Sequence, residues 1–141
     1  MIPLSAEQLV EAWDRVRENA GCAGVDGITV DRYEHRGLGG LVQLAQEIQQ
    51  GAYKALPLLQ ILVEPKPGKR RELHVPTVRD RVVQTAVARV LSKAFEEEFL
   101  DASYAYRPGR SVDRAIARVI QWRERGYTHV IAPTSPPFST A

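Results

Sequence analysis

Residues 58–75 read LLQILVEPKPGKRRELHV, and this stretch decides the fold expected for the chain. Two apolar runs, Leu58 to Val63 and Leu73 to Val75, flank a Pro67-Gly68 turn. Proline presets the first central residue of such a turn, and glycine tolerates the positive φ of the second. The pattern therefore predicts a β-hairpin.

Positive charge gathers at the tip of this hairpin and just beyond it. The cations are Lys66, Lys69, Arg70, Arg71, Arg79 and Arg81. A charge run alone is usually a solvated turn. A second basic group, however, surrounds Tyr104 and Tyr106 and consists of Arg107, Arg110 and Arg114. The presence of both groups favours a polyanionic ligand.

Apolar residues at helical intervals predict two helices before the hairpin. The first covers residues 6–20, with Ser5 and Gln8 at the spacing of a capping box. Trp13 lies on its apolar stripe and is expected in the core rather than on a ligand. A second, short helix ends at Gly51, and the glycines at residues 37–40 predict a flexible connector before it.

The longest predicted helix covers residues 78–99, with Thr77 as its cap. Its inward face is predicted to carry Val83, Val87, Val90, Ala94 and Phe95. A further helix is capped by Ser111 and runs to about Arg125, with its inward face formed by Val112, Ala115, Ile116, Val119 and Trp122. Residues 127–131 alternate like the first strand of a sheet.

Composition narrows the class of protein. A chain of 141 residues is ordinarily one domain, and 44% hydrophobic with 26% charged residues is typical of a globular fold. The net charge of +2 is mild, so the basic character is local. Cys22 is the only cysteine, which excludes an internal disulfide and favours a cytoplasmic location. No stretch approaches the roughly 20 apolar residues of a membrane span, so no membrane partner is expected.

Three segments resemble one protein family. They are AGVDG at residues 23–27, KPGKRRELHVPTVRDRVVQ at residues 66–84 and SYAYRPGRS at residues 103–111. Together they resemble the fingers region of bacterial reverse transcriptases, most closely the group II intron-encoded type and its CRISPR-associated relatives. The resemblance covers roughly residues 8–130. It implies an α+β fold, the fingers subdomain of a right-hand polymerase, with helices packed on the basic hairpin.

The resemblance also implies roles for the basic residues. Contacts to the phosphates of a dNTP are implied for Lys69, Arg71 and Arg79. Contacts to the RNA template are implied for Lys66, Arg70, Arg81, Tyr104, Tyr106, Arg107, Arg110 and Ser111. The loop at residues 21–27 is implied to approach the template.

Each of these roles has a structural alternative. Arg79 and Arg81 alternatively pair with Asp80, Glu72 or a carboxylate elsewhere in the chain. Tyr104 and Tyr106 alternatively pack beneath the loop while Arg107 braces it. The scattered histidines are expected to be ordinary surface or strand residues. The acidic run at residues 96–98 is expected to be solvated, because adjacent helix positions point in different directions and cannot converge on a metal.

Polymerases of this family use two Mg²⁺ ions held by carboxylates. The first carboxylate belongs to an Asp-Ile-x-x-Phe-Phe-Asp pattern that follows a segment like residues 126–130, and the second pair to Tyr-x-Asp-Asp. This sequence instead continues with PTSPPFSTA at residues 133–141. No catalytic residue, metal ligand or cofactor is therefore assigned here, and Mg²⁺ is expected only in a full-length enzyme.

The tail at residues 132–141 is interpreted as aberrant. Codons exist that encode PTSPPFSTA in one frame and Asp-Ile-Thr-Ala-Phe-Phe-Asp-Ser in the next, which suggests a frameshift after about Ile131 in a reverse transcriptase gene. The expected organisation is thus a fingers region at residues 1–131, truncated before the palm, and an aberrant tail.

The expected function is that of an N-terminal fragment of an RNA-directed DNA polymerase, inactive alone. RNA template, dNTP and a missing palm and thumb polypeptide are its expected partners. Two alternatives stay open: a stand-alone RNA-binding or partner-docking module, and a degenerate gene product without function. Salt-sensitive RNA affinity distinguishes the first alternative, and aggregation without RNA affinity distinguishes the second.

Overall fold

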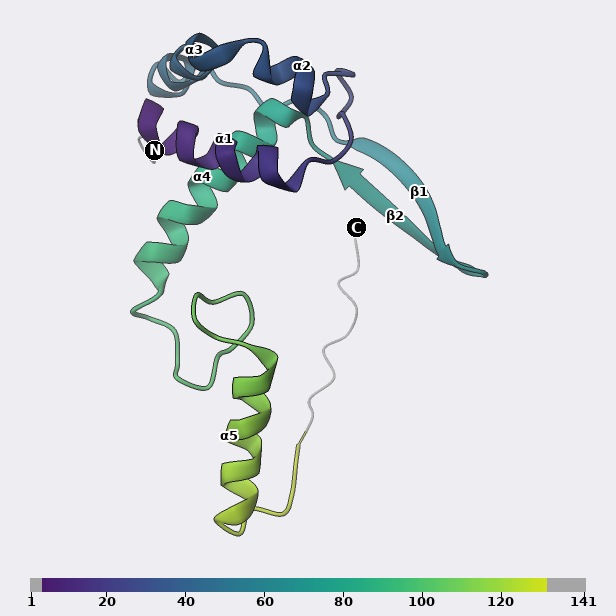
Figure 1. Cartoon of the computed structure of the whole chain (residues 1–141), viewed down its shortest axis with the longest axis vertical. Helices are drawn as coiled ribbons and strands as arrows, with labels where there is room; N and C mark the ends of the chain where they lie inside the picture. The colour runs from purple at the N-terminus through teal and green to yellow at the C-terminus, as the bar shows by residue number, and fades with distance from the viewer. Residues whose placement is uncertain (1–3, 132–141) are drawn as a thin grey trace. The chain divides into compact units, whose positions relative to one another are not determined.

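The computed structural model describes residues 4–131, and the fold is α+β (Figure 1). The described residues form five helices and one two-stranded antiparallel sheet. They divide into two compact units, and the boundary falls between Phe95 and Glu96. None of the helices in residues 4–131 combines the length and the apolar character needed to cross a bilayer.

The first unit contains four helices and the hairpin. The helices are α1 (Ala6–Asn19), α2 (Val30–Glu34), α3 (Gly37–Gln49) and α4 (Val78–Phe95). At the start of α1 the amide of Gln8 donates to Oγ of Ser5 at 3.2 Å, and the amide of Ser5 donates to Oε1 of Gln8 at 2.8 Å. This capping box confirms the predicted start of the first helix.

The core of the first unit lies between α1, α3 and α4. Leu9, Leu44 and Val82 are almost fully buried and come from these three helices. Trp13 is also buried, as predicted, and its ring lies 5.2 Å from that of Tyr33 on α2. The apolar stripe of each helix therefore faces the other helices.

The expected flexible connector at Gly37, Gly39 and Gly40 was wrong. These residues form the first turn of α3. The same helix buries Leu41 and Leu44 in the core. Helical propensity is a weak preference, and tertiary packing of an apolar face outweighs the cost of glycine in a helix.

The hairpin confirms the prediction from the sequence. Strands β1 (Leu59–Lys66) and β2 (Lys69–Val75) pair antiparallel, with Leu59 opposite Val75 and Val63 opposite Arg71. The register is irregular between Val63 and Lys66. Gly68 adopts a φ of 76°, which is the reason a glycine is needed in the turn.

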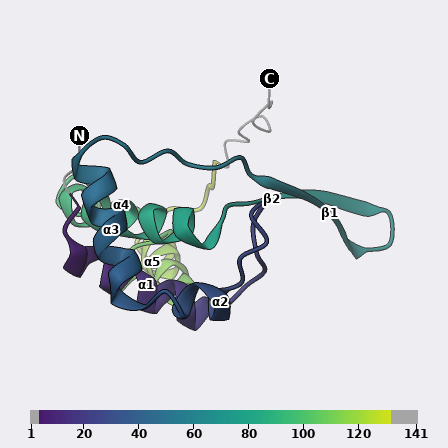
Figure 2. The same ribbon diagram turned by 90° about the horizontal axis from the view of Figure 1, so that it is seen from above.

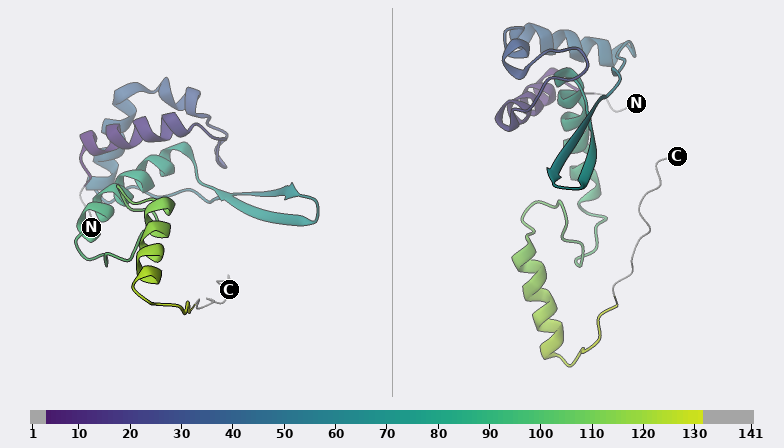
Figure 3. Two further views of the ribbon diagram at one scale, coloured as in Figure 1. Left: turned by 60° about the horizontal axis from the view of Figure 1, so that its bottom comes forward. Right: turned by 90° about the vertical axis from the view of Figure 1, so that its right-hand side faces the viewer.

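The hairpin extends away from the helices instead of supporting them (Figures 2 and 3). No strand residue belongs to the buried core of the described chain. The expectation that the helices pack on the hairpin was therefore wrong, and they pack on one another. The physical reason is that the tip is made of charged residues, which cannot be buried without partners.

Helix α4 ends four residues earlier than predicted. The amide of Asp80 donates to Oγ1 of Thr77 at 3.1 Å, so the predicted cap is confirmed. At the other end the helix stops at Phe95, whose side chain is 51% exposed, and Ala94 is also exposed. Residues 96–98 leave the helix, because three carboxylates are unfavourable at the negative end of a helix dipole.

The second unit consists of a loop followed by α5 (Val112–Glu124). The amide of Arg114 donates to Oγ of Ser111 at 3.2 Å, which confirms the predicted cap. The predicted inward face of α5 is not buried, because nothing in the described part of this unit covers it. Residues 127–131 form no strand, since the described chain offers no neighbouring strand with which their backbone could pair. The predicted aberrant tail lies outside the described residues.

Candidate nucleic-acid interface

The tip of the hairpin is a cluster of exposed cations. Lys66 lies opposite Lys69 in the ladder. Nε of Arg70 lies 3.6 Å from Oε2 of Glu64, and the Arg70 side chain is 72% exposed. Such a contact between solvated side chains contributes little to stability. The four cations Lys66, Lys69, Arg70 and Arg71 are thus held on the turn while their charges face water.

The strand pairing sorts these cations by face. Arg71 is opposite Val63 in the ladder, so the two side chains lie on the same face. Side chains alternate along a strand, which places Lys69 on the face of Arg71 and Arg70 on the other face. Neither Lys69 nor Arg71 forms an ion pair with any residue in the described chain. Two of the three residues expected to contact dNTP phosphates, Lys69 and Arg71, therefore lie on one face of the hairpin.

Arg79 and Arg81, in contrast, are engaged within the first unit. Arg79 forms an ion pair with Glu47, and its guanidinium lies 5.3 Å from the centre of the Tyr53 ring. Its side chain is 28% exposed. Of the open alternatives for Arg79, the structure displays the contact with a carboxylate. A phosphate contact by this residue stays a prediction and would require it to leave Glu47.

Arg81 holds the loop that follows α1. Its Nη1 donates to the carbonyl of Ala20 at 3.1 Å, and its Nη2 donates to the carbonyl of Cys22 at 2.7 Å. Gly24 of the same loop lies against the start of α4, where a Cβ atom would approach Cα of Thr77 to 2.6 Å. The loop that was implied to approach a template is thereby fixed to α4.

Asp80 is a residue to which the sequence analysis assigned no functional role. It is 2% exposed, and its carboxylate accepts hydrogen bonds from the hydroxyl of Tyr53 at 2.7 Å, the hydroxyl of Thr77 at 2.7 Å and the amide of Leu56 at 3.1 Å. Burial and the hydrogen bond to Asp80 raise the pKa of Tyr53. Asp80 therefore fixes the segment that leads into β1 and so orients the hairpin. An acidic residue at the third position after a threonine signalled the cap, but nothing in the sequence signalled Tyr53 as a partner.

Arg107 organises the loop of the second unit. Its Nη2 donates to Oε1 of Glu96 at 2.8 Å, and its Nη1 donates to the carbonyls of Leu100 and Ser103 at 2.8 and 2.9 Å. The side chain is only 6% exposed. The hydrogen bond from Arg107 lowers the pKa of Glu96. The structure thus displays the bracing alternative for Arg107.

The two tyrosines of this loop differ sharply. Tyr106 has a φ of 57° and a fully exposed side chain. Positive φ is uncommon for a bulky residue, so the backbone of the loop is strained at this position. Tyr104 is partly buried, and the guanidinium of Arg110 lies 5.1 Å from its ring centre. Tyr106 is therefore available to stack on a base, while Tyr104 supports Arg110.

Arg110 lies between the loop and α5. Its Nη1 donates to the carbonyl of Asp101 at 3.0 Å, and its Nη2 lies 3.3 Å from Oδ1 of Asp101. Arg114 and Arg118 continue from it along α5 and line the same pocket. The sequence analysis grouped Arg114 with the basic residues without assigning it a role, and it did not consider Arg118. Their spacing of four residues was the signal that would have found them.

The structure brings together the cations of the hairpin tip in the first unit, and Tyr104, Arg110 and Ser111 in the second. It directs Arg79, Arg81 and Arg107 to internal partners. In the described residues, no group of three or more His, Cys, Asp or Glu side chains is arranged to hold a metal.

Comparisons with known proteins find several relatives, some of them encoded in introns. No family model matches it. It is 35% identical over 102 residues to Protein YkfC of Escherichia coli, which covers 72% of this chain and 27% of that protein. It is 28% identical over 109 residues to the group II intron-encoded protein LtrA of Lactococcus lactis, covering 77% of this chain and 18% of LtrA. A 91 kDa protein in the cob intron of Schizosaccharomyces pombe is 25% identical over 116 residues, covering 82% and 14% respectively.

Over about four fifths of its length the chain is homologous to group II intron-encoded proteins. This finding confirms the resemblance drawn from the sequence motifs. The chain spans about a quarter of Protein YkfC and less than a fifth of the other two relatives.

Proposed function

We propose that this chain is the template-binding and nucleotide-binding fingers part of an RNA-directed DNA polymerase of the intron-encoded type. The observation that carries the proposal is the hairpin tip, where four exposed cations lie within six residues. Lys69 and Arg71 share a face and have no carboxylate partner in the described chain. Such a surface attracts a phosphate-bearing ligand, and homology to intron-encoded proteins favours RNA and dNTP as that ligand.

The roles within this proposal follow from where the side chains lie. Lys69 and Arg71 meet the phosphates of an incoming nucleotide, since fixed cations stabilise charge on a transferred group. Lys66 and Arg70 contact the RNA backbone from the turn and the opposite face. In the second unit, Tyr106 stacks on a base and Arg110 with the Ser111 hydroxyl meets the RNA backbone. Arg107 acts by positioning the loop that carries the contacts of the second unit, whereas Arg81 fixes the loop at residues 21–27 to α4.

Polymerase activity from this chain alone is not expected. The reaction needs carboxylates that converge on two metal ions. Residues 4–131 present no such group. The proposal is therefore one of binding, and a palm and thumb polypeptide would supply the chemistry.

RNA affinity measured against salt tests the proposal. We would measure fluorescence anisotropy of a labelled single-stranded RNA with the wild-type chain and with K69Q/R71Q. Each phosphate contact to a single strand contributes about 0.7 to the slope of log K against log salt, so the double variant should lower the slope by about 1.4. The control is R15Q/R32Q, which removes two exposed arginines on α1 and α2.

Binding that is equally strong and equally salt-dependent in K69Q/R71Q and the control would contradict the role of the hairpin. The absence of any RNA affinity in the wild-type chain, together with aggregation, would instead favour a degenerate gene product.

A second candidate function is docking on the remainder of the polymerase. One observation favours it: the apolar face of α5 is open, with Val112, Ile116 and Val119 exposed by 75, 52 and 60%. These residues line a groove of about 530 Å³. The occupant we propose is the palm polypeptide, because the relatives are several times longer than this chain. Co-elution with a separately expressed segment of LtrA from outside the matched region, lost in I116E/V119E, would support docking. Co-elution unchanged by these substitutions would contradict it.

A further inference from the structure

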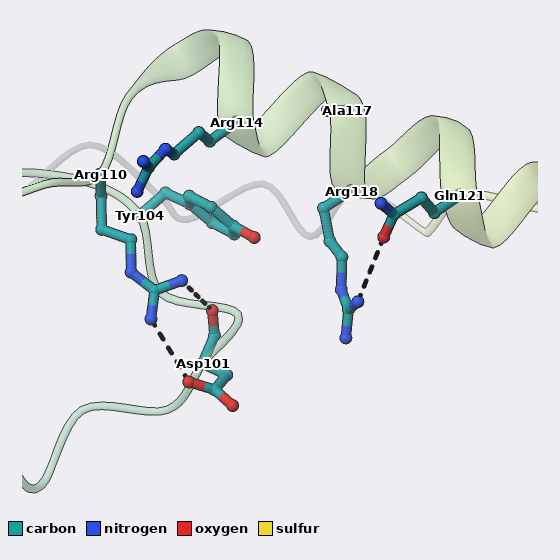
Figure 4. Close-up of a pocket in the computed structure, with 7 residues that line it drawn as sticks. All are labelled: Asp101, Tyr104, Arg110, Arg114, Ala117, Arg118 and Gln121. Atoms are coloured by element: carbon teal, nitrogen blue, oxygen red, sulfur yellow. Dashed lines mark hydrogen bonds and ion pairs between the residues drawn. The ribbon is translucent and has the colours of Figure 1, made fainter.

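The second unit contains a basic pocket that joins two residues of the SYAYRPGRS motif, Tyr104 and Arg110, to one face of α5. Its volume is about 420 Å³, and Figure 4 shows the side chains that line it. They are Asp101, Tyr104, Arg110, Arg114, Ala117, Arg118 and Gln121. Three guanidiniums and one carboxylate meet there, so the lining carries an excess of positive charge. That charge is concentrated on one side of a small unit and is not a property of the whole chain.

Contacts from neighbouring groups hold the three arginines in place. Arg110 is fixed by Asp101 and the Tyr104 ring. Arg114 donates to the carbonyl of Gly109. Arg118 donates to Oε1 of Gln121 at 3.3 Å, and its guanidinium lies 5.1 Å from the centre of the Trp122 ring.

Each arginine keeps donors for a further ligand. A guanidinium carries five N–H donors, and these contacts occupy only one or two of them on each arginine. Asp101, the only carboxylate in the lining, has a fully exposed side chain and already pairs with Arg110. It therefore leaves the charges of Arg114 and Arg118 uncompensated within the pocket.

The arginines form a stripe along α5. Arg114, Arg118, Gln121 and Arg125 are spaced by four, three and four residues, which places them on one face of the helix. Arg114 and Arg118 are separated by about 6 Å along the helix axis, since each residue rises about 1.5 Å. The apolar residues Val112, Ile116 and Val119 lie on the opposite face. The stripe thus stays accessible when the apolar face is covered.

Aromatic rings lie between the cations of this stripe. Tyr104 is under Arg110 at one end, and Trp122 lies between Arg118 and Arg125 at the other. Cations interleaved with aromatic rings are typical of surfaces that bind single-stranded nucleic acid, where rings stack on bases and arginines meet the backbone. A compact anion such as free phosphate would use the arginines but leave the rings unused.

We propose that Arg110, Arg114 and Arg118 form a binding track for consecutive phosphates of a single RNA strand. The proposal rests on the proposed function, because it takes RNA as the ligand, and it deepens it by naming a surface beyond the hairpin. Arg107 is not part of the track, since its side chain is buried in the loop. Arg114 and Arg118, in place of Arg107, join Arg110 among the contacts to the RNA template.

The test is RNA binding by the full chain carrying R114Q/R118Q, measured against salt with a labelled oligouridylate. Loss of two single-strand phosphate contacts should weaken binding roughly 25-fold at about 0.1 M salt and lower the salt slope by about 1.4. The control R32Q/R123Q also removes two exposed arginines, one of them on the other face of α5, and should bind like the wild type. R114K/R118K keeps both positive charges, so the salt slope of RNA binding should stay that of the wild type. If the arginines act only through structural hydrogen bonds of their forked side chains, R114K/R118K should instead show the lower slope.

Each remaining outcome decides against the track. Wild-type binding by R114Q/R118Q, with weakened binding by K69Q/R71Q, would overturn this inference and leave the proposed function standing. No salt-dependent affinity in the wild-type chain would overturn both. Displacement of the RNA by polyglutamate at equal charge concentration would show a general preference for polyanions and would overturn the assignment to RNA.

Discussion

The hydroxyl of Tyr53 donates a 2.7 Å hydrogen bond to Oδ1 of Asp80, across 27 residues of sequence. The carboxylate also accepts from the amide of Leu56, three residues before β1 begins. A buried carboxylate at the start of α4 thus holds the root of the hairpin. The direction of the basic tip depends on this contact, although neither residue carries the charge that would meet RNA.

Removal of the Asp80 carboxylate should unfold the first unit readily. In D80A the hydroxyl of Tyr53 and the amide of Leu56 lose their partner while remaining partly buried, so we expect a loss of about 3 kcal/mol in the free energy of unfolding. D80N preserves the shape and one acceptor oxygen and should lose less. Urea unfolding followed by circular dichroism measures whether stability falls from the wild type through D80N to D80A. A D80A variant as stable as D80N would contradict the anchoring role.

Tyr53 should make the stability of the first unit sensitive to alkaline pH. Its pKa is raised in the folded state, so the folded chain holds the phenolic proton more tightly than the unfolded chain does. This contribution is present below pH about 10 and is lost as the pH rises above it. Y53F should cost about 1 kcal/mol at neutral pH, and its stability should fall less steeply than that of the wild type above pH 10. Burial also raises the pKa of Tyr33. Part of the fall in stability above pH 10 should therefore remain in both Y53F and the wild type.

Two glycine substitutions should have opposite effects. In G24A the added Cβ would lie 2.6 Å from Cα and 2.7 Å from the amide nitrogen of Thr77, which are backbone atoms that cannot move aside. We expect a destabilisation of about 1 to 3 kcal/mol. Gly39 has open space around it and lies in the first turn of α3, so G39A should stabilise by roughly 0.5 to 1 kcal/mol. Thermal unfolding of both variants measures the contrast, and a shift of the same sign would contradict the close approach.

Arg107 should control the ionisation of Glu96. The hydrogen bond from Arg107 lowers the pKa of this carboxyl. The pair therefore stabilises the folded state at pH values above the ordinary pKa of a glutamate, and this stabilisation is lost as the pH falls through the lowered pKa. In R107Q the pKa of Glu96 should return to its ordinary range. A carbon-detected NMR titration of the side-chain carboxyl measures it. An unchanged, low pKa in R107Q would show that another group is responsible.

The sequence predicted the local structure well where one residue type suffices. Pro67 and Gly68 located the turn of the hairpin, and Ser5, Thr77 and Ser111 located three helix starts. The prediction from the sequence failed where contacts with another part of the chain determine the local structure. The glycines at residues 37–40 became helical because Leu41 and Leu44 are buried by other helices. The residues at 127–131 formed no strand because none is available to pair with them.

The candidate site was predictable in part for the same reason. The cations at the hairpin tip are exposed because of where the turn lies, and their charge can be read directly from the sequence. The carboxylate partners of Arg79 and Arg107 lie 32 and 11 residues away, and the carbonyl partners of Arg81 lie 61 and 59 residues away. No local pattern therefore revealed that these arginines are engaged internally. A helical-wheel projection of α5 would have placed Arg114 and Arg118 on one face. The sequence analysis assigned them no role because it considered the motif residues only.

The most direct test of the account follows the backbone amides of the labelled chain by NMR while single-stranded RNA is added. The account predicts chemical-shift changes at Gly68 to Arg71 and along Tyr106 to Arg118, weakened as salt is raised. Amides of α1 and α3, which belong to neither basic surface, should change little. Changes confined to α1 and α3, or none at RNA concentrations well above those of the protein, would contradict the claim that these two basic surfaces bind RNA.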